Sequence, residues 1–179
     1  RRALALEADE PGGPGRRFLE RTQPSLEAQL CNLADEIAYN AHDVDDGVRS
    51  GLLTLDQVGE VPLVARFRDE ALREHPHLRG RRLLFETIRR MLSAQVYDVL
   101  DASAERIRTH APRTVDEVRA APPLICFSEA MASQSRELKR FLRDNLYRHP
   151  QVMETTSQAK QVVRELFAAY TAAPSAWAE

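Results

Sequence analysis

The sequence predicts an all-α fold, a bundle of helices, on three observations. Apolar residues recur at the spacing of a helix face in several long stretches, and no stretch shows the strict apolar and polar alternation of a strand. The connections between these stretches are short, as is usual where successive helices pack on one another. A chain of 179 residues is long enough to bury a core without disulfide or metal cross-links, so it corresponds to one domain or one large piece of one.

The first 24 residues are expected to form a mobile segment that precedes the bundle. Residues 8–24 hold Pro11, Pro14 and Pro24 together with three glycines, a composition typical of loops. The opening residues complete no helical pattern, and the first residue is not methionine. We therefore expect the chain to be a piece of a longer protein.

The first long helix is predicted over residues 25–51. Ser25, directly after Pro24, is a typical N-cap, and Gly51 is a typical C-terminal stop. One face of this helix is apolar and is formed by Leu30, Leu33, Ile37, Ala41, Val44 and Val48. At 3.6 residues per turn, a second face gathers ligand-type side chains within a sector of about 100°: Asp35, Tyr39, His42, Asp43 and Asp46. A solvated acidic surface and a ligand-binding face are the two interpretations of this pattern.

Residues 52–179 are predicted to form a C-terminal region of further helices. Capping pairs at Thr54–Gln57 and Thr114–Glu117 start two of them, and Pro150 suits the first turn of the last. Two prolines keep residues 122–127 extended. The predicted helices begin near residues 54, 62, 80, 114, 128 and 150, and those from 80 and 128 run to about 110 and 147.

Charge and composition argue against several classes of function. A formal net charge of -2 gives no global electrostatic case for binding nucleic acid or a membrane surface. The chain lacks an apolar run long enough for a transmembrane span, and its basic start lacks the apolar stretch of a signal peptide, so a cytoplasmic location is predicted. Cys31 and Cys126 have apolar neighbours and are predicted to be reduced core residues.

Four segments resemble the deoxyguanosine triphosphate triphosphohydrolase-like branch of the HD-domain phosphohydrolases. They are SLEAQ, NLADEIAYNAHDVDDGVRSGLL, APRTVDEVRAAPPLICFSEAM and LKRFLRDNLYRHPQV, and the resemblance covers roughly residues 25–172. The motif over residues 35–43 is much more specific than a single dipeptide. The resemblance implies that residues 25–51 form the last helix of an HD-type domain and that the chain is the C-terminal portion of such a phosphohydrolase.

The resemblance also implies an activity and assigns roles to residues. Family members use water to attack the α-phosphate of a deoxynucleoside triphosphate, which gives a deoxynucleoside and triphosphate. They bind a divalent metal, magnesium or manganese, through a histidine, an adjacent His-Asp pair and a distant aspartate, and Asp35 corresponds to that last aspartate. Tyr39 and Asp43 correspond to contacts with the deoxyribose of the substrate. His42 follows the final ligand, and it is interpreted as a structural residue or a neighbour of the ligands and not as a ligand itself. The first three ligands would precede residue 1, so the metal site is expected to be incomplete and the isolated chain inactive.

The sequence is also compatible with other functions. The apolar faces at residues 83–100 and 152–170 suit a helical interaction or oligomerisation module without catalysis, and family members are often homo-oligomers. An HD scaffold can also act on another nucleotide or phosphoester. Tyr147, Arg148 and His149 form either a phosphate-facing cluster or the basic end of a helix, and the sequence favours the capping role.

Overall fold

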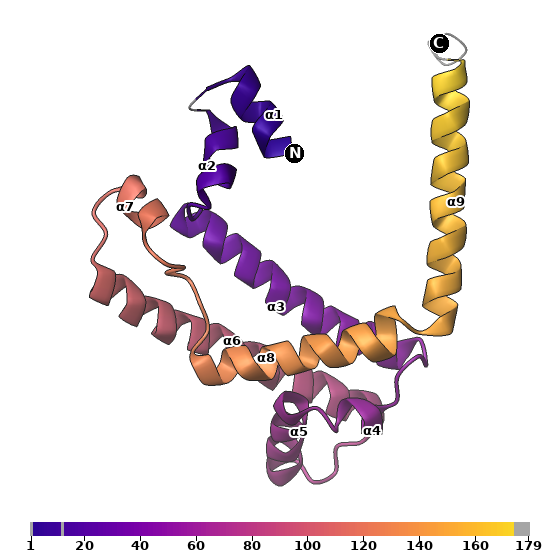
Figure 1. Cartoon of the computed structure of the whole chain (residues 1–179). Helices are drawn as coiled ribbons and strands as arrows, with labels where there is room; N and C mark the ends of the chain where they lie inside the picture. Colours follow the sequence, from indigo (N-terminus) through magenta and orange to yellow (C-terminus); the bar gives the residue numbers. More distant parts are fainter. Residues whose placement is uncertain (1, 12, 174–179) are drawn as a thin grey trace, which may run out of the picture.

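The computed structural model describes residues 2–11 and 13–173, and these residues form helices and loops with no strand among them (Figure 1). The predicted all-α fold is confirmed. In chain order the helices are α1 (Arg2–Asp9), α2 (Pro14–Glu20), α3 (Leu26–Arg49), α4 (Leu55–Val58), α5 (Pro62–Glu74), α6 (Gly80–His110), α7 (Val115–Ala120), α8 (Glu129–Leu142), the π-helical turn η1 (Arg143–Tyr147) and α9 (Pro150–Ala172). None of the helices in these described ranges has the length and apolar character needed to cross a bilayer.

The start and end signals of α3 act as the sequence predicts. The Ser25 hydroxyl accepts a hydrogen bond from the backbone N–H of Ala28 at 3.5 Å, which satisfies one of the free donors of the first turn. After the helix ends at Arg49, Gly51 takes a φ of 77°, a left-handed conformation that costs glycine little. The position of α3 in the chain is therefore fixed by local signals.

The N-terminal segment contains helical structure, part of which falls within the loop predicted over residues 8–24. Residues 2–9 and 14–20 are helical in α1 and α2, and the two helices pack on each other. Pro14 stands in the first turn of α2, where a missing N–H costs nothing and the fixed φ suits a helix. The proline and glycine cluster thus marks the boundary between two short helices.

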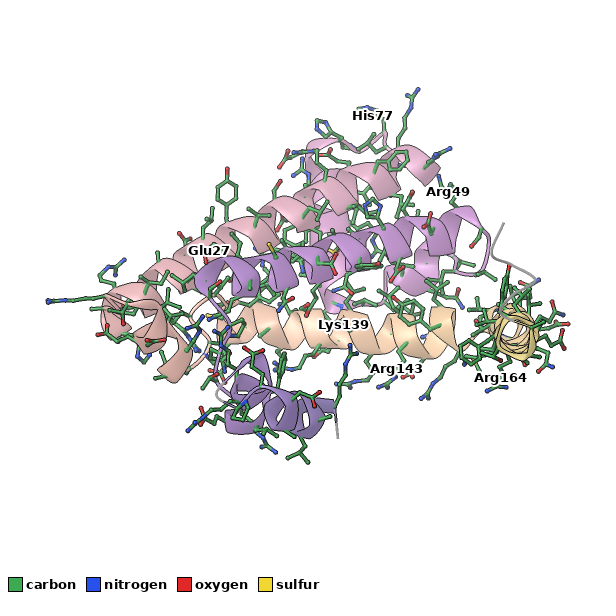
Figure 2. The ribbon with its side chains drawn as sticks, turned by 90° about the horizontal axis from the view of Figure 1, so that it is seen from above. Glu27, Arg49, His77, Lys139, Arg143 and Arg164 are labelled. Atoms are coloured by element: carbon green, nitrogen blue, oxygen red, sulfur yellow. The ribbon has the colours of Figure 1, made fainter. Side chains whose placement is uncertain are left out.

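The core lies where α3, α5, α6 and α8 meet. In Figure 1, α6 and α8 cross beside α3 with α5 below them, and Figure 2 shows α3 lying between α6 and α8. Buried apolar side chains from all four helices form one continuous cluster, which includes Ile37, Val44, Leu63, Phe67, Leu84, Met91, Leu138 and Leu142. This packing holds α3 with one side in the core and the other toward solvent.

Burial departs from the predicted pattern on α3, on α6 and in the segment before α8. Cys31 is exposed and Cys126 is only partly buried, so the prediction that both cysteines are core residues is wrong. On α6, Val96 and Leu100 are exposed although they continue the apolar spacing. The apolar faces of α3 and α6 are wider than the part of each helix that neighbouring helices cover. Residues at the edge of such a face therefore stay exposed.

The predicted helix over residues 128–147 is present as α8 followed directly by η1. Ser128 caps α8 by accepting a hydrogen bond from the Met131 N–H at 3.2 Å. The π-helical turn shifts the angular position of the last residues by widening the helix there. Beyond it, α9 runs away from the bundle (Figure 1) and has no buried residue.

Candidate functional site

The ligand-type residues of α3 lie on its solvent-facing side. Ile37, Ala41 and Val44 anchor the opposite side in the core. As a result Asp35 is exposed, the Tyr39 side chain is 61% exposed and Asp43 is partly buried. Their spacing of four residues places them along about 12 Å of helix. These three side chains are therefore available to one extended ligand.

Asp43 is held by a partner that the sequence analysis did not foresee. The Tyr147 hydroxyl, carried by η1, donates a hydrogen bond to a carboxylate oxygen of Asp43. Burial, the hydrogen bond to Asp43 and that carboxylate's charge raise the pKa of Tyr147 to about 12. The phenol stays protonated at neutral pH and remains a donor. Tyr147 thus lies against the ligand-type face of α3, a contact that neither interpretation of the cluster at residues 147–149 includes.

Asp35 has an unobstructed carboxylate. It forms no hydrogen bond or ion pair with the described residues, whereas the nearby Asp46 is paired with Arg49 at 2.5 Å. Within residues 2–11 and 13–173, no group of three or more His, Cys, Asp or Glu side chains is placed to hold a metal ion. The described residues thus offer a cation one carboxylate at this position, and by themselves they do not fit a complete metal site.

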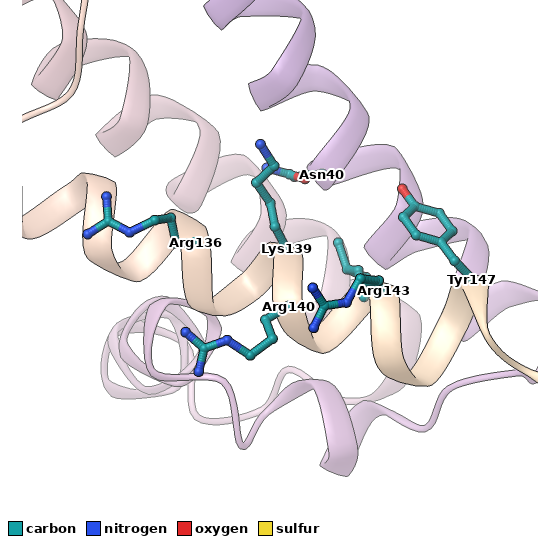
Figure 3. A pocket seen from close by; sticks show the side chains of 7 residues that line it. Asn40, Arg136, Lys139, Arg140, Arg143 and Tyr147 are labelled. Carbon is teal, nitrogen blue, oxygen red and sulfur yellow. The ribbon is translucent and has the colours of Figure 1, made fainter.

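A cavity opens beside this face, between α3 and α8 (Figure 3). Its volume is about 520 Å³, within the range of small-molecule sites. Residues of α3, α8 and η1 line it, and four of them are cationic, three from α8 and one from η1: Asn40, Arg136, Lys139, Arg140, Leu142, Arg143 and Tyr147. Tyr147 therefore borders both the cavity and the Asp43 carboxylate. The sequence analysis identified neither the cavity nor Asn40 as part of a site.

Two comparisons relate the chain to known proteins. The family model of a phosphohydrolase-associated domain matches residues 125–178. Proteins named deoxyguanosinetriphosphate triphosphohydrolase-like protein are similar over nearly the whole chain. The one from Bordetella pertussis is 55% identical over 170 residues, which are 95% of this chain and 44% of that protein. The one from Ralstonia nicotianae is 53% identical over 91% of this chain and 42% of its own length. The one from Thiobacillus denitrificans is 50% identical over 92% of this chain and 44% of its own length.

These matches confirm the resemblance that the sequence motifs predict. The similarity extends over the α3 motif as well as the C-terminal helices, since it covers more than nine-tenths of the chain. The chain spans less than half the length of these relatives. The relatives' name describes a hydrolase acting on a nucleoside triphosphate.

Proposed function

We propose that this chain, a relative of the deoxyguanosinetriphosphate triphosphohydrolase-like proteins, forms part of a metal-dependent deoxynucleoside triphosphate triphosphohydrolase. Its α3 helix provides one carboxylate for a divalent ion, magnesium or manganese, and a platform for the deoxyribose of the substrate. When bound, such an ion polarises a phosphoryl oxygen and lowers the pKa of a water. The complete enzyme would release a deoxynucleoside and triphosphate.

The observation that carries this proposal is the arrangement of Tyr39, Asp43 and Tyr147. The Tyr39 side chain is exposed, so its ring can offer an apolar face to a sugar. An ionised carboxylate has about four acceptor positions, and Tyr147 occupies one at Asp43. The remaining acceptor positions can take a hydrogen bond from a 3'-hydroxyl. Asp43 is thereby oriented before substrate arrives.

Asp35 stands two turns before Asp43 on the same side of α3. Because it has no partner among the described residues, binding a cation there breaks no existing contact. The separation of about 12 Å allows one nucleotide to meet Asp43 at its sugar and Asp35 near its phosphates. The two acids therefore serve different ends of the same ligand.

Substitutions in the complete protein test these roles separately. Asp35→Asn should abolish metal-dependent triphosphate release while the helix content is retained. Asp43→Ala should raise KM and remove most of the discrimination against substrates lacking the 3'-hydroxyl. Asp46→Asn is the matched control, because it removes a charge from the same helix and breaks only an exposed ion pair with Arg49. Its kinetics should match the unmodified enzyme.

Two results would contradict the proposal. Normal turnover of the Asp35→Asn enzyme would show that this carboxylate is not a metal ligand. If Asp43→Ala lowers kcat/KM by the same factor for a 3'-deoxy substrate and for the normal substrate, then Asp43 does not contact the 3' position. A panel of other nucleotides and phosphoesters tests the alternative substrate classes. If the complete enzyme hydrolyses one of them faster than a deoxynucleoside triphosphate, that compound is assigned as the substrate instead.

A second candidate function is a helical interaction module, and α9 favours it. This helix of 23 residues buries none of its side chains, and Val163, Leu166 and Phe167 are exposed. Large exposed apolar faces usually meet a partner, here a second copy of the chain. Sedimentation should show self-association that Val163→Gln with Phe167→Gln reduces. A monomer at all concentrations would exclude the homo-oligomer.

A further inference from the structure

A second cavity lies between the last turns of α3, the short helix α4 and the first turns of α6. Its volume is about 300 Å³, at the lower end of the range of small-molecule sites. Arg49, labelled in Figure 2, marks the end of α3 that borders this cavity. The lining residues are Asp45, Val48, Arg49, Leu55, Gly80, Arg81 and Leu84. None of them belongs to the Asp35, Tyr39 and Asp43 face or lines the cavity beside α8.

We propose that this second cavity binds a free apolar α-amino acid, a small zwitterion with an aliphatic side chain. Three features of the cavity match the ammonium group, the carboxylate and the side chain of such a molecule. The binding needs neither a divalent ion nor a nucleotide. It therefore goes beyond the proposed function, and the two proposals can fail independently.

Asp45 provides the contact for the ammonium group. One oxygen of its carboxylate, Oδ1, is buried and has no hydrogen-bond partner among the described residues. The next acid on α3 differs, because Asp46 is paired with Arg49 at 2.5 Å. A buried carboxylate oxygen without a partner costs free energy, since water no longer solvates it. An ammonium group in the cavity offsets this cost.

Arg81 provides the contact for the carboxylate of the ligand. Its guanidinium carbon lies 5.0 Å from the centre of the Phe85 ring, and within residues 2–11 and 13–173 it forms no ion pair, not even with Asp45 across the cavity. A guanidinium stacked on a ring keeps its N–H donors at the edge, where they suit a planar carboxylate. The first N–H groups of α6 add to the attraction, because the N-cap residue Arg79 makes no side-chain hydrogen bond to them.

An apolar wall provides the contact for the side chain of the ligand. It consists of Val48, Leu55 and Leu84. Leu84 belongs to the continuous core, and Val48 and Leu55 pack against that core, so the fold holds the wall in place. An aliphatic side chain that leaves water for this wall contributes to affinity through burial of apolar surface.

The charge balance argues against other classes of ligand. Apart from the pair of Arg49 with Asp46, the lining residues supply one positive side chain and one negative side chain, neither of them paired with a described residue. A phosphate chain meets only one unpaired cation here, and the Asp45 carboxylate repels it. A ligand with a single charge leaves either Asp45 or Arg81 without a partner, whereas a zwitterion pairs with both.

Calorimetric titration of the 179-residue chain with L-leucine tests the proposal, and we expect saturable binding. Leucinamide lacks the carboxylate and 4-methylpentanoate lacks the ammonium group. Each should bind at least about tenfold more weakly than leucine, as for loss of a hydrogen bond to a charged group. Glycine lacks the apolar side chain and should also bind more weakly. The proposal is overturned if leucine does not bind, or if either analogue with one charge binds as tightly as leucine.

Two substitutions assign the two charged ends of the ligand. Asp45→Asn should remove the preference for leucine over 4-methylpentanoate, and Arg81→Gln should remove the preference for leucine over leucinamide. The matched controls are Asp101→Asn and Arg82→Gln, which remove the same charges from exposed positions of α6 that do not line this cavity. Both controls should keep both preferences, and circular dichroism should show the same helix content for all variants.

The outcome is decisive even if a substitution at the cavity prevents folding, because the titrations of the unmodified chain with leucine and its analogues then decide alone. If folded Asp45→Asn and Arg81→Gln chains keep both preferences, leucine binds elsewhere and the cavity is not its site. The same conclusion follows if the control variants lose affinity for leucine as strongly as the cavity variants do.

Discussion

Tyr147 and Asp43 lie 104 positions apart in the sequence, and their hydrogen bond joins α3 to η1. The bond holds one acidic side chain of the proposed sugar site in a fixed orientation. A carboxylate that is oriented in advance loses less freedom when a ligand binds. Tyr147 therefore acts on the proposed substrate through Asp43.

Tyr147→Phe removes this hydrogen bond and keeps the ring. In the complete protein we expect KM for a deoxynucleoside triphosphate to rise about three- to tenfold with kcat nearly unchanged, as for loss of one hydrogen bond to a charged group. Tyr97→Phe is the control, because the Tyr97 side chain is 67% exposed and lies on α6. Steady-state kinetics measure both. Equal KM values for the two variants would show that Tyr147 does not position Asp43.

Gln29 connects α3 to the extended segment before α8. Its side-chain oxygen accepts hydrogen bonds from the backbone N–H groups of Leu124 at 2.9 Å and Ile125 at 3.1 Å, and its Nε2 donates to the Pro24 carbonyl at 2.9 Å. Leu124 is fully buried, so water cannot replace this partner.

Gln29→Leu leaves the two N–H groups without a partner and should lower the free energy of unfolding by about 2–5 kcal/mol. The same substitution at Gln95 is the matched control. Gln95 is fully buried on α6, and neither of its side-chain polar atoms has a hydrogen bond in the described residues. Gln95→Leu should therefore be neutral or stabilising. Urea unfolding measures both changes, and a larger loss for Gln95→Leu would contradict this account.

At the scale of elements, an arginine links α5 and α6 in addition to their shared apolar core. Arg90 of α6 donates to Glu74 of α5 at 2.6 Å and to Glu86 of its own helix at 2.7 Å. The hydrogen bonds from Arg89 and Arg90 lower the pKa of Glu86 to about 2, from an ordinary value of 4.5. The folded state therefore binds the Glu86 proton more weakly than the unfolded state does.

This lowered pKa predicts how stability depends on pH. The contribution of Glu86 to the free energy of unfolding is fully present above pH 4.5 and is lost as the pH falls toward 2. Urea unfolding at pH 5 and pH 2.5 should show Glu86→Gln losing less stability on acidification than the unmodified chain, by a difference on the order of 1 kcal/mol. Glu105→Gln alters an exposed ion pair with Arg108 and serves as the control. Its stability should change between the two pH values as much as that of the unmodified chain. An unchanged pH dependence in Glu86→Gln would refute the assignment.

At the scale of the whole molecule, the bundle of α3, α5, α6 and α8 contains its own continuous core. The 179-residue chain should therefore fold into a helical unit without further protein. It should also release no triphosphate and bind manganese weakly, because one carboxylate leaves the ion mostly hydrated. Circular dichroism, a triphosphate-release assay and calorimetry measure these properties. Turnover that survives repurification, or tight manganese binding lost in Asp35→Ala, would show that a complete site is present.

The sequence by itself determined where most helices begin and end, because capping residues, first-turn prolines and apolar periodicity act over a few residues. The same periodicity placed Asp35, Tyr39 and Asp43 on one side of α3. The local pattern failed within residues 8–24, where α2 takes the place of part of the predicted loop, and at Cys31, which is exposed.

Only the tertiary structure decided which distant side chains meet. The bond from Tyr147 to Asp43 depends on the crossing of α8 with α3 and on the π-helical turn that presents Tyr147. The cavity that Asn40 lines together with basic side chains of α8 and η1 depends on the same crossing. A contact between two helices is set by how their whole surfaces pack, and this packing is a property of many residues at once, which no local pattern contains.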